Sequence, residues 1–516
     1  MKNIKVSPEW QLIWLLAAVK LALHFLTNTN YGLQRDAFLY LALSDHLDWG
    51  FLSVPPLIAV IGKVTTSLFG DSVFAVRFFP AIVGSVSVML IGQLVRNLGG
   101  KKWAIGLACT AFILSPAFLR SNTLFQPVSF NQFFWLLTVF LVMKMVQTQT
   151  PKYWLVIGLT CALAFLNKYS IAFLVAALLI GLLLTPHRTL LRSKYLLFGV
   201  LAGFALIAPN LYWQHQHNWP VVTHMGELQR TQLVHVNIGD FMLMQLLMNL
   251  PGLPVWGLGV LFLLFFKDGQ KYRFLGFTFL AMILILLMLS GKPYYTLGIY
   301  SALFAVGGFA AEQYFIGRRR FMQPVILIFM LSIALPIMPF SLPVLSHEKM
   351  ATYGRMMKPY GFGGALRWED GRLYALPQDY ADMTGWEELA QKVSVVYNNL
   401  EPAERAKTAI YAENYGQAGA IRYFGRKYGL PEPVSFSGSF LFWAPDSVDM
   451  KTLIYVNDDP GPDIYALFGS VEIVARIEDP FARESGLPVF LCRNPDPDFF
   501  TFYREKVSGR RSRFLR

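Results

Sequence analysis

The sequence predicts an all-α polytopic membrane domain followed by a smaller extramembrane α/β domain at the carboxyl end. Its 516 residues are 54% hydrophobic and only 15% charged, whereas an average soluble protein has about 25% charged residues. Segments such as 105–118, 196–208 and 274–289 carry no charged residue over the length of a helix. Lipid permits only helices or closed barrels, and barrel strands would alternate apolar and polar residues. These runs therefore predict membrane-spanning helices.

By the hydropathy criterion we expect about eleven spans. The amino-terminal stretch counts as a retained first span, because His24 and Phe25 stand where a signal peptide would need small residues for cleavage. The expected spans lie near residues 11–26, 75–95, 104–119, 128–147, 154–167, 169–185, 196–213, 241–266, 274–290, 295–315 and 321–341.

The distribution of basic residues predicts the orientation of the chain. Lys2, Lys5 and the loops around 96–102, 188–194 and 318–320 form a set rich in Lys and Arg, and the alternate loops carry few. Because positively charged loops stay in the cytoplasm, the amino terminus is expected inside. After an odd number of spans, the carboxyl-terminal tail is expected outside.

Two regions outside the expected spans are long enough to fold. The first outer loop, 27–74, has apolar residues at helical spacing in 36–48 and 56–69, which is typical of helices that lie on a membrane surface. The tail contains short helical or strand-like runs, separated by Gly and Pro, at 384–397, 409–412, 452–456 and 471–477. We therefore divide the chain into a transmembrane domain, 1–341, and an outer α/β or α+β domain, 342–516.

Composition excludes several classes of function. Cys109 and Cys161 fall in expected spans and Cys492 stands alone in the tail, so neither a disulfide within one domain nor a thiolate metal site is expected. The net charge of +13 arises largely in the short inner loops, where it sets orientation. A nucleic-acid partner is therefore not expected.

The first outer loop contains a candidate general base. Asp36 follows the first span closely, and Tyr40 lies one helical turn later on the same face. A carboxylate beside a membrane surface could accept a proton from an acceptor hydroxyl. The alternative is structural, because Asp is also a favoured residue for capping the amino-terminal end of a helix.

Several segments together resemble a known enzyme family. In the first outer loop they are 31–40 (YGLQRDAFLY), 47–58 (LDWGFLSVPPLI) and 68–80 (LFGDSVFAVRFFP). Later segments are 164–170 (AFLNKYS), 209–219 (PNLYWQHQHNW), 291–295 (GKPYY), 413–419 (ENYGQAG) and 442–445 (FWAP). In order and spacing they resemble the polyprenyl-phosphate-sugar-dependent membrane glycosyltransferases of GT-C fold, which include protein O-mannosyltransferases and lipid A aminoarabinose transferases.

The resemblance implies a function and a location. The expected enzyme moves a sugar, with inversion, from a polyprenyl-phosphate donor such as undecaprenyl phosphate to a lipid, glycan or protein acceptor. It would lie in a bacterial inner membrane, with its tail in the periplasm. Asp36 matches the family's acid in loop one and would be the base, and Gln126 would contact acceptor or sugar. The residues expected to bind the lipid phosphate of the donor are Tyr40, Lys168, Arg230, Lys292, Tyr294 and Tyr295.

Each of these donor-binding assignments has a structural alternative. Lys168 could be a helix-end lysine that snorkels, and Lys292, between Gly and Pro, could be a solvated turn residue. The tyrosines could belong to the aromatic belt at the membrane interface. Arg230 could pair with Glu227 on the surface, which contributes little energy.

The sequence also departs from the family pattern. Gln126 stands where many relatives place a second acid, and a neutral amide cannot share in proton transfer. Ser53 and Val54 replace the Glu-Lys pair of aminoarabinose transferases, so one expected phosphate-binding cation is absent. These departures argue against aminoarabinose as the sugar, and they leave room for a non-catalytic glycan- or lipid-binding member of the fold.

No cofactor is expected with certainty. Histidines cluster after the seventh expected span and could bind a divalent metal, but no acidic partner lies at a usual ligand interval. The histidines concerned are His215, His217, His224 and His235. The other alternative function is a transporter or lipid flippase, but we see no internal repeat. Lys20 is the one ionisable residue deep in an expected span, and it could reach an interface by snorkelling.

Overall fold

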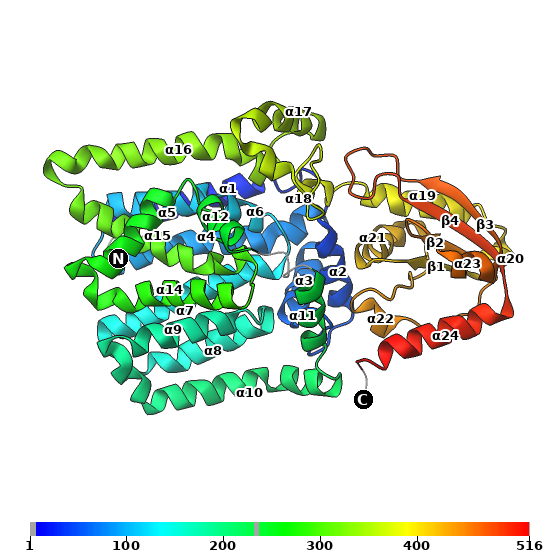
Figure 1. Cartoon of the computed structure of the whole chain (residues 1–516), viewed down its shortest axis with the longest axis horizontal. Helices are drawn as coiled ribbons and strands as arrows, with labels where there is room; N and C mark the ends of the chain where they lie inside the picture. Colours follow the sequence, from blue (N-terminus) through cyan, green and yellow to red (C-terminus); the bar gives the residue numbers. More distant parts are fainter. Residues whose placement is uncertain (1–6, 232–236, 515–516) are drawn as a thin grey trace, which may run out of the picture. The chain divides into compact units, whose positions relative to one another are not determined.

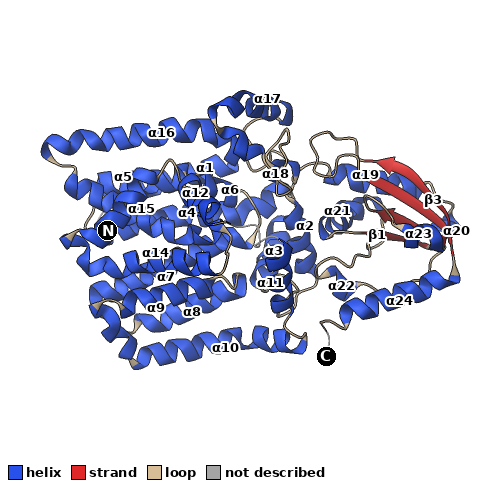
Figure 2. Cartoon of the chain, in the orientation of Figure 1, coloured by secondary structure: helices blue, strands red, loops and turns tan. Residues whose placement is uncertain are grey.

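The computed structural model describes residues 7–231 and 237–514, so Lys2, Lys5 and His235 lie outside the described residues. Contacts divide the chain into two compact units. The bundle unit comprises Met1–Asn28, Phe74–Leu211 and Met225–Leu342. The tail unit comprises Thr29–Val73, Tyr212–His224 and Pro343–Arg516. In the described chain, the strands of the sheet all lie in the carboxyl-terminal segment (Figure 2).

Helices make up the chain up to residue 341 (Figure 1). In order they are α1 (Pro8–Phe25), α2 (Arg35–Asp45), α3 (Leu57–Phe69), α4 (Val73–Leu98), α5 (Lys102–Leu114), α6 (Pro116–Ser121), α7 (Pro127–Thr148), α8 (Tyr153–Asn167), α9 (Ile171–Leu183), α10 (Lys194–Gln216), α11 (Pro220–Thr231), α12 (Ile238–Leu247), α13 (Leu253–Phe265), α14 (Arg273–Met288), α15 (Leu297–Tyr314) and α16 (Met322–Ser341). Short 3-10 helices lie between some of them, among them η1 (Pro186–Arg192) and η4 (Pro293–Thr296).

Glycines let the helices of the bundle unit approach closely. A Cβ atom added at Gly158 of α8 would lie 2.1 Å from the carbonyl oxygen of Gly199 in α10. One added at Gly307 of α15 would lie 1.8 Å from the carbonyl oxygen of Val255 in α13. Small residues at such crossings are typical of helices that associate within membranes, where van der Waals contact drives packing.

Six helices of the described chain are long and apolar enough to cross a membrane, and the count rises to seven if the bent pair α9 and η1 forms one span. Five further apolar helices are shorter, with 10–17 residues. The prediction of about eleven spans is therefore not confirmed. Helices such as α5 and α13, with 13 residues each, fall short of the roughly 20 residues that cross a bilayer unaided.

Lys20 does not reach an interface, which corrects the expectation of snorkelling. It is fully buried within the bundle unit, and its Nζ donates a hydrogen bond of 3.1 Å to the carbonyl oxygen of Phe118. The same ammonium group lies 5.2 Å from the centre of the Phe112 ring. The carbonyl oxygen of Phe118 and the ring face of Phe112 therefore contact the ammonium group in place of water.

The tail unit combines α2, α3 and a carboxyl-terminal mixed sheet. The elements after residue 342 are α17 (His347–Met357), α18 (Gln378–Ala381), α19 (Trp386–Asn398), α20 (Pro402–Arg405), β1 (Thr408–Ala412), α21 (Tyr415–Gly425), α22 (Phe440–Trp443), β2 (Thr452–Val456), α23 (Pro462–Leu467), β3 (Phe468–Arg476), β4 (Pro488–Pro495) and α24 (Pro497–Arg511). The strand order is β1-β2-β4-β3, in which β1 and β2 are parallel and β4 is antiparallel to both of its neighbours.

Local patterns predicted several of these elements well. The run 452–456 is β2, 409–412 lies within β1, and 471–477 overlaps most of β3. β4 was not predicted. The domain boundary at 342 stays a prediction, because the compact tail unit also contains α2 and α3 from the first loop.

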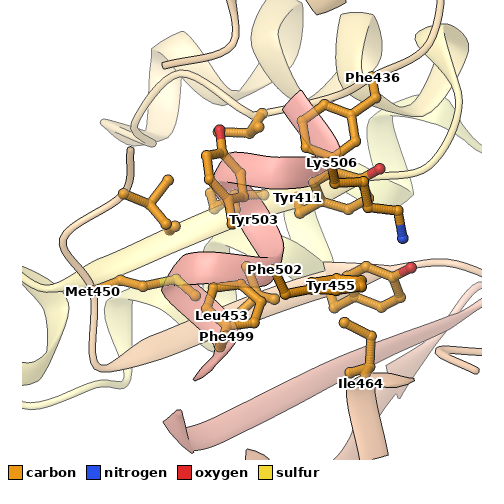
Figure 3. A pocket seen from close by; sticks show the side chains of 14 residues that line it. Tyr411, Phe436, Met450, Leu453, Tyr455, Ile464, Phe499, Phe502, Tyr503 and Lys506 are labelled. Atoms are coloured by element: carbon orange, nitrogen blue, oxygen red, sulfur yellow. The ribbon is translucent and has the colours of Figure 1, made fainter. Parts of the chain in front are cut away.

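A small aromatic cavity lies between the sheet and α24 (Figure 3). The hydroxyl groups of Tyr411 and Tyr455 and the amino group of Lys506 point to the same side of it. The two tyrosine rings are stacked, with their centres 5.2 Å apart. The cavity volume of about 40 Å³ holds only a few waters, so this region serves mainly as the core of the tail unit.

Candidate functional site

Asp36 lies in the first turn of α2. The helix is capped by Gln34, whose side-chain oxygen accepts a hydrogen bond of 2.8 Å from the backbone N–H of Asp36. The alternative that Asp36 itself is the cap is therefore wrong. A carboxylate in the first turn is also favoured by the partial positive charge of the helix amino terminus.

The carboxylate of Asp36 is held by a residue from the far end of the chain. The phenol of Tyr415 donates a hydrogen bond of 2.8 Å to Oδ1 of Asp36, across 379 positions of sequence. The Nε atom of Arg35 lies 3.8 Å from the same oxygen, and the Arg35 guanidinium lies 5.4 Å from the centre of the Tyr415 ring. The Asp36 side chain keeps 26% of its surface exposed, so small molecules can still approach it.

A second, buried acid completes this network. Asp382 is 2% exposed and accepts a hydrogen bond of 3.1 Å from Nη1 of Arg483, while its carbonyl oxygen accepts from the backbone N–H of Arg35 at 2.9 Å. Burial raises the pKa of Asp382, although the positive charges of Arg35 and Arg483 act in the opposite direction. Burial also raises the pKa of Tyr415, and the negative charge of Asp36 adds to that rise.

The segment that carries Tyr415 is shaped to meet α2. Asn414 and Gln417 form a capping box at the start of α21, which sets where the helix begins. A Cβ atom at Gly416 would lie 2.4 Å from Cγ of Arg35, and one at Gly419 would lie 2.8 Å from Cβ of Phe38. The two glycines therefore allow α21 to contact α2 directly.

Tyr40 lies one turn after Asp36 on α2, as predicted, and is 8% exposed. Its carbonyl oxygen accepts a hydrogen bond of 2.8 Å from the Ser44 hydroxyl. Its assignment to the donor phosphate stays a prediction.

The bundle unit brings together three of the predicted donor-binding residues. The Nζ atom of Lys168, at the carboxyl-terminal cap of α8, lies 5.1 Å from the ring centres of both Tyr294 and Tyr295 in η4. Lys292 is the residue that precedes η4 as its amino-terminal cap. Aromatic faces attract an ammonium group, so the two rings favour the Lys168 side chain at this position.

Gln126 is connected to the Lys168 group through its neighbour in sequence, Pro127. It caps the amino-terminal end of α7, and the carbonyl oxygen of the adjacent Pro127 accepts a hydrogen bond of 2.9 Å from the Asn167 side chain. On the other side of Lys168, the Tyr169 hydroxyl donates to Oδ1 of Asn210 at 3.3 Å. Arg230 is exposed on α11.

The histidines of the tail unit take part in stacking. His217 stacks on Trp213 and His46 on Trp443, with ring centres 3.9 and 4.0 Å apart. Both pairs line a cavity of about 210 Å³ together with Asp48, whose Oδ2 accepts a hydrogen bond of 2.7 Å from the Trp213 indole. Within residues 7–231 and 237–514, no group of three His, Cys, Asp or Glu side chains is arranged to hold a metal ion.

The arrangement supplies two kinds of chemistry. The tail unit offers an oriented carboxylate, suited to accept a proton, and the bundle unit offers an ammonium group framed by tyrosines, suited to an anion. Sequence reasoning selected Asp36 and Lys168, but it assigned no chemistry to Tyr415, Asp382 or Arg483. The segment 413–419 was noted for its motif, and that motif was the one available signal for Tyr415.

Comparisons with known proteins agree with the predicted family. Residues 53–213 match the family described as dolichyl-phosphate-mannose-protein mannosyltransferase. A 205-residue segment is 27% identical to the lipid A galacturonosyltransferase RgtD of Rhizobium johnstonii. That segment covers 39% of this chain and 43% of RgtD, so the chain matches less than half of its curated relative.

Solved structures extend the similarity to nearly the whole chain. ArnT from Cupriavidus metallidurans bound to undecaprenyl phosphate has a TM-score of 0.62 and 14% sequence identity, covering 94% of this chain and 98% of ArnT. The apo form of ArnT gives 0.61 and 15%, with the same coverage. The mycobacterial arabinofuranosyltransferase AftD gives 0.51 at 13% identity, covering 96% of this chain and 42% of AftD. This chain is therefore a multi-pass membrane protein that has the GT-C fold and is similar to the protein O-mannosyltransferase and lipid A aminoarabinose transferase superfamily.

Proposed function

We propose that this chain is an inverting glycosyltransferase that moves a hexosyl or pentosyl group from a polyprenyl-phosphate donor to an acceptor on the periplasmic face of a bacterial inner membrane. The GT-C fold supports the reaction class. A solved relative binds undecaprenyl phosphate, which supports a lipid-phosphate donor. A second relative is named for lipid A, which favours a lipid over a glycan or protein acceptor.

The observation that carries this proposal is the oriented carboxylate of Asp36. In the proposed step, the acceptor oxygen attacks the anomeric carbon while its proton passes to Asp36. The bond from that carbon to the phosphate oxygen breaks, and the polyprenyl phosphate leaves with the electron pair. Attack opposite the leaving group inverts the anomeric centre. The hydrogen bond from Tyr415 to Oδ1 holds the carboxylate in one orientation for this transfer.

The lipid phosphate that departs gains negative charge, which needs positively charged or hydroxyl groups. Lys168 supplies an ammonium group, and Tyr294 and Tyr295 supply hydroxyls within the same cluster. A charged hydrogen bond to a phosphate oxygen is roughly twice as strong as a neutral one. We assign Tyr40, Lys292 and Arg230 to the same donor and Gln126 to the acceptor or sugar, as the family resemblance implies.

The test is Asp36→Asn, which removes the base and changes the side chain by one atom. We expect transfer to fall by about 10²–10⁴-fold, the usual contribution of general base catalysis. The assay is mass spectrometry of lipid A and surface glycans from a deletion strain that carries each variant.

Asp45→Asn is the matched control, because Asp45 lies at the other end of α2 and forms ion pairs with Arg422 and Arg426. The Asp45 side chain is 30% exposed and that of Arg426 is 54% exposed; surface pairs of this kind contribute about 0–1 kcal/mol, so the control should keep its activity. Full transfer by Asp36→Asn would remove Asp36 from the base role. Net solute uptake by reconstituted protein without sugar transfer would instead favour a transporter.

The proposed location depends on the orientation of the chain. Reporters fused after Leu26 and after Leu342 should both be found in the periplasm, because these sites border the segments that carry Asp36 and Tyr415. A cytosolic reporter at either site would place these groups on the wrong side of the membrane.

A further inference from the structure

We propose that Tyr415 is a positioning residue for Asp36, so that the carboxyl-terminal segment is a working part of the catalytic site. This inference rests on the proposed function and adds to it a residue that the family resemblance did not assign. The tail would then contribute directly to the rate of transfer, beyond any role in binding the acceptor or covering the site.

The hydrogen bond from Tyr415 orients the carboxylate of Asp36. A carboxylate at the start of a helix can rotate about its side-chain bonds, and a base is effective only when its oxygen faces the proton that it takes. The phenol of Tyr415 fixes Oδ1 of Asp36 at 2.8 Å. Hydrogen bonds to an ionised acceptor are short and strong, so the contact restrains the orientation of the whole carboxylate.

Tyr415 is itself held in place. Oε1 of Glu484 accepts a hydrogen bond of 3.5 Å from the Asn414 side chain, and Oε2 accepts one of 3.1 Å from Gln417. Asn414 and Gln417 are the two members of the capping box that begins α21. The helix start that presents Tyr415 is therefore anchored on both sides of the tyrosine.

Charged residues also face the hydrogen-bonded pair formed by Asp36 and Tyr415. The charged groups that face it are Arg35, beside Asp36 and over the Tyr415 ring, and Asp382, which pairs with Arg483. Burial and the nearby charge of Asp36 raise the pKa of Tyr415. The phenol therefore keeps its proton at neutral pH and remains the donor in the hydrogen bond.

The test compares Tyr415→Phe with Tyr423→Phe. Both tyrosines lie on α21, and each loses only a hydroxyl, but the Tyr423 hydroxyl donates to the backbone carbonyl oxygen of Asp71 instead of to Asp36. The probes are undecaprenyl-phosphate sugars, including galacturonic acid, with lipid A as acceptor. We expect Tyr415→Phe to lower kcat by about 10–100-fold with an unchanged KM. Tyr423→Phe should stay within about threefold of wild type.

A double-mutant cycle separates positioning from a structural role. In the Asp36→Asn background no base remains to be oriented, so Tyr415→Phe should change the residual rate by less than about twofold. An equal loss in both backgrounds would mean that Tyr415 supports the fold and would overturn the proposal. Wild-type kcat in Tyr415→Phe would overturn it as well.

The base role of Asp36 and the positioning role of Tyr415 can fail separately. If Asp36→Asn abolishes transfer and Tyr415→Phe does not affect it, only the positioning role falls. If Asp36→Asn transfers as well as wild type, the base assignment falls and the positioning role with it. If the wild-type protein transfers none of the probe sugars, while the deletion strain has normal lipid A and surface glycans, the proposed function itself is contradicted.

Discussion

The described contacts of Asp36 and Lys168 come from different kinds of group. Asp36 is held by a hydrogen bond from Tyr415, with Arg35 close by, and these groups connect to the Asp382–Arg483 pair. Lys168 lies against the faces of two tyrosine rings that are adjacent in sequence. A directional hydrogen bond restrains the acid, and two ring faces attract the cation.

This difference corresponds to what each group is proposed to do. A base must present one oxygen at one angle, so restraint increases its efficiency. A cation that binds the departing phosphate must accept a change of charge and position during the reaction, so its charge matters more than one fixed direction. The contrast predicts that the acid will tolerate geometric change poorly and that the cation will depend mainly on charge.

For the Lys168 group, removing the charge of Lys168 should give the largest effect on kcat. We expect Lys168→Ala to reduce kcat by about 10²–10³-fold, similar to the loss of one group that stabilises developing negative charge. Lys168→Arg should keep more of the activity, because a guanidinium also stacks on aromatic rings.

The matched control for Lys168 is Lys194→Ala. Lys194 also lies near a tyrosine ring, at 5.9 Å from the centre of Tyr195, but it is the first residue of α10 and not part of the Lys168 group. It should keep wild-type rates in the same sugar-transfer assay. Equal losses in the two variants would show that the effect concerns stability and not the donor phosphate.

Crowding the contact between α21 and α2 should give an intermediate effect. A Cβ atom at Gly419 would lie 2.8 Å from Cβ of Phe38 and 3.0 Å from its backbone, so Gly419→Ala forces the helices apart. Overpacking of this kind costs about 1–3 kcal/mol, and the melting temperature in detergent should fall.

Gly509→Ala is the opposite control. Gly509 lies within α24 with no atom within 4 Å of its added Cβ, so alanine should stabilise the protein by about 0.5–1 kcal/mol. If both variants melt alike, the close approach of α21 and α2 contributes nothing to the rigidity of the acid's surroundings.

The smallest predicted effect concerns pH. Burial raises the pKa of Asp382 in the folded state, against the charges of Arg35 and Arg483. The folded protein therefore binds this proton more tightly than the unfolded chain, and stability is lost as pH rises from about 4, the unfolded pKa, through the folded pKa. The loss is about 1.4 kcal/mol per unit by which the pKa is raised.

Asp382→Asn cannot titrate, so its melting temperature is the reference. The melting temperature of wild type minus that of this variant should be highest below about pH 4, and this difference should decline as pH rises. A difference that grows with pH would mean that the ion pair with Arg483 outweighs the cost of burial.

Local patterns in the sequence were sufficient for much of the fold. The strand-like run 452–456 is β2, and the apolar residues at helical spacing in 36–48 predicted a helix, which the structure places at Arg35–Asp45. The number of spans was harder to predict. A hydropathy window measures composition, and it does not show that α5 and α13 end after 13 residues.

The part of the candidate site that sequence could not supply depends on long-range contacts. Asp36 and Tyr415 are 379 positions apart, and no periodicity relates them. Lys20 illustrates the same limit, because its burial depends on a carbonyl group 98 positions away. Lys168 and its two tyrosines were each chosen by motif, but only the structure shows the ammonium group over both rings.

The composition of the tail unit has a consequence for biosynthesis. Its first stretch ends at Val73 and its last begins at Pro343, so about 270 residues separate the two. At roughly 5–20 residues per second, the ribosome needs about a quarter of a minute to most of a minute to make the intervening chain. During that interval α2 has no α21 to contact. The newly made first loop must therefore remain without this contact, or be protected by a chaperone, until the last third of the protein is made.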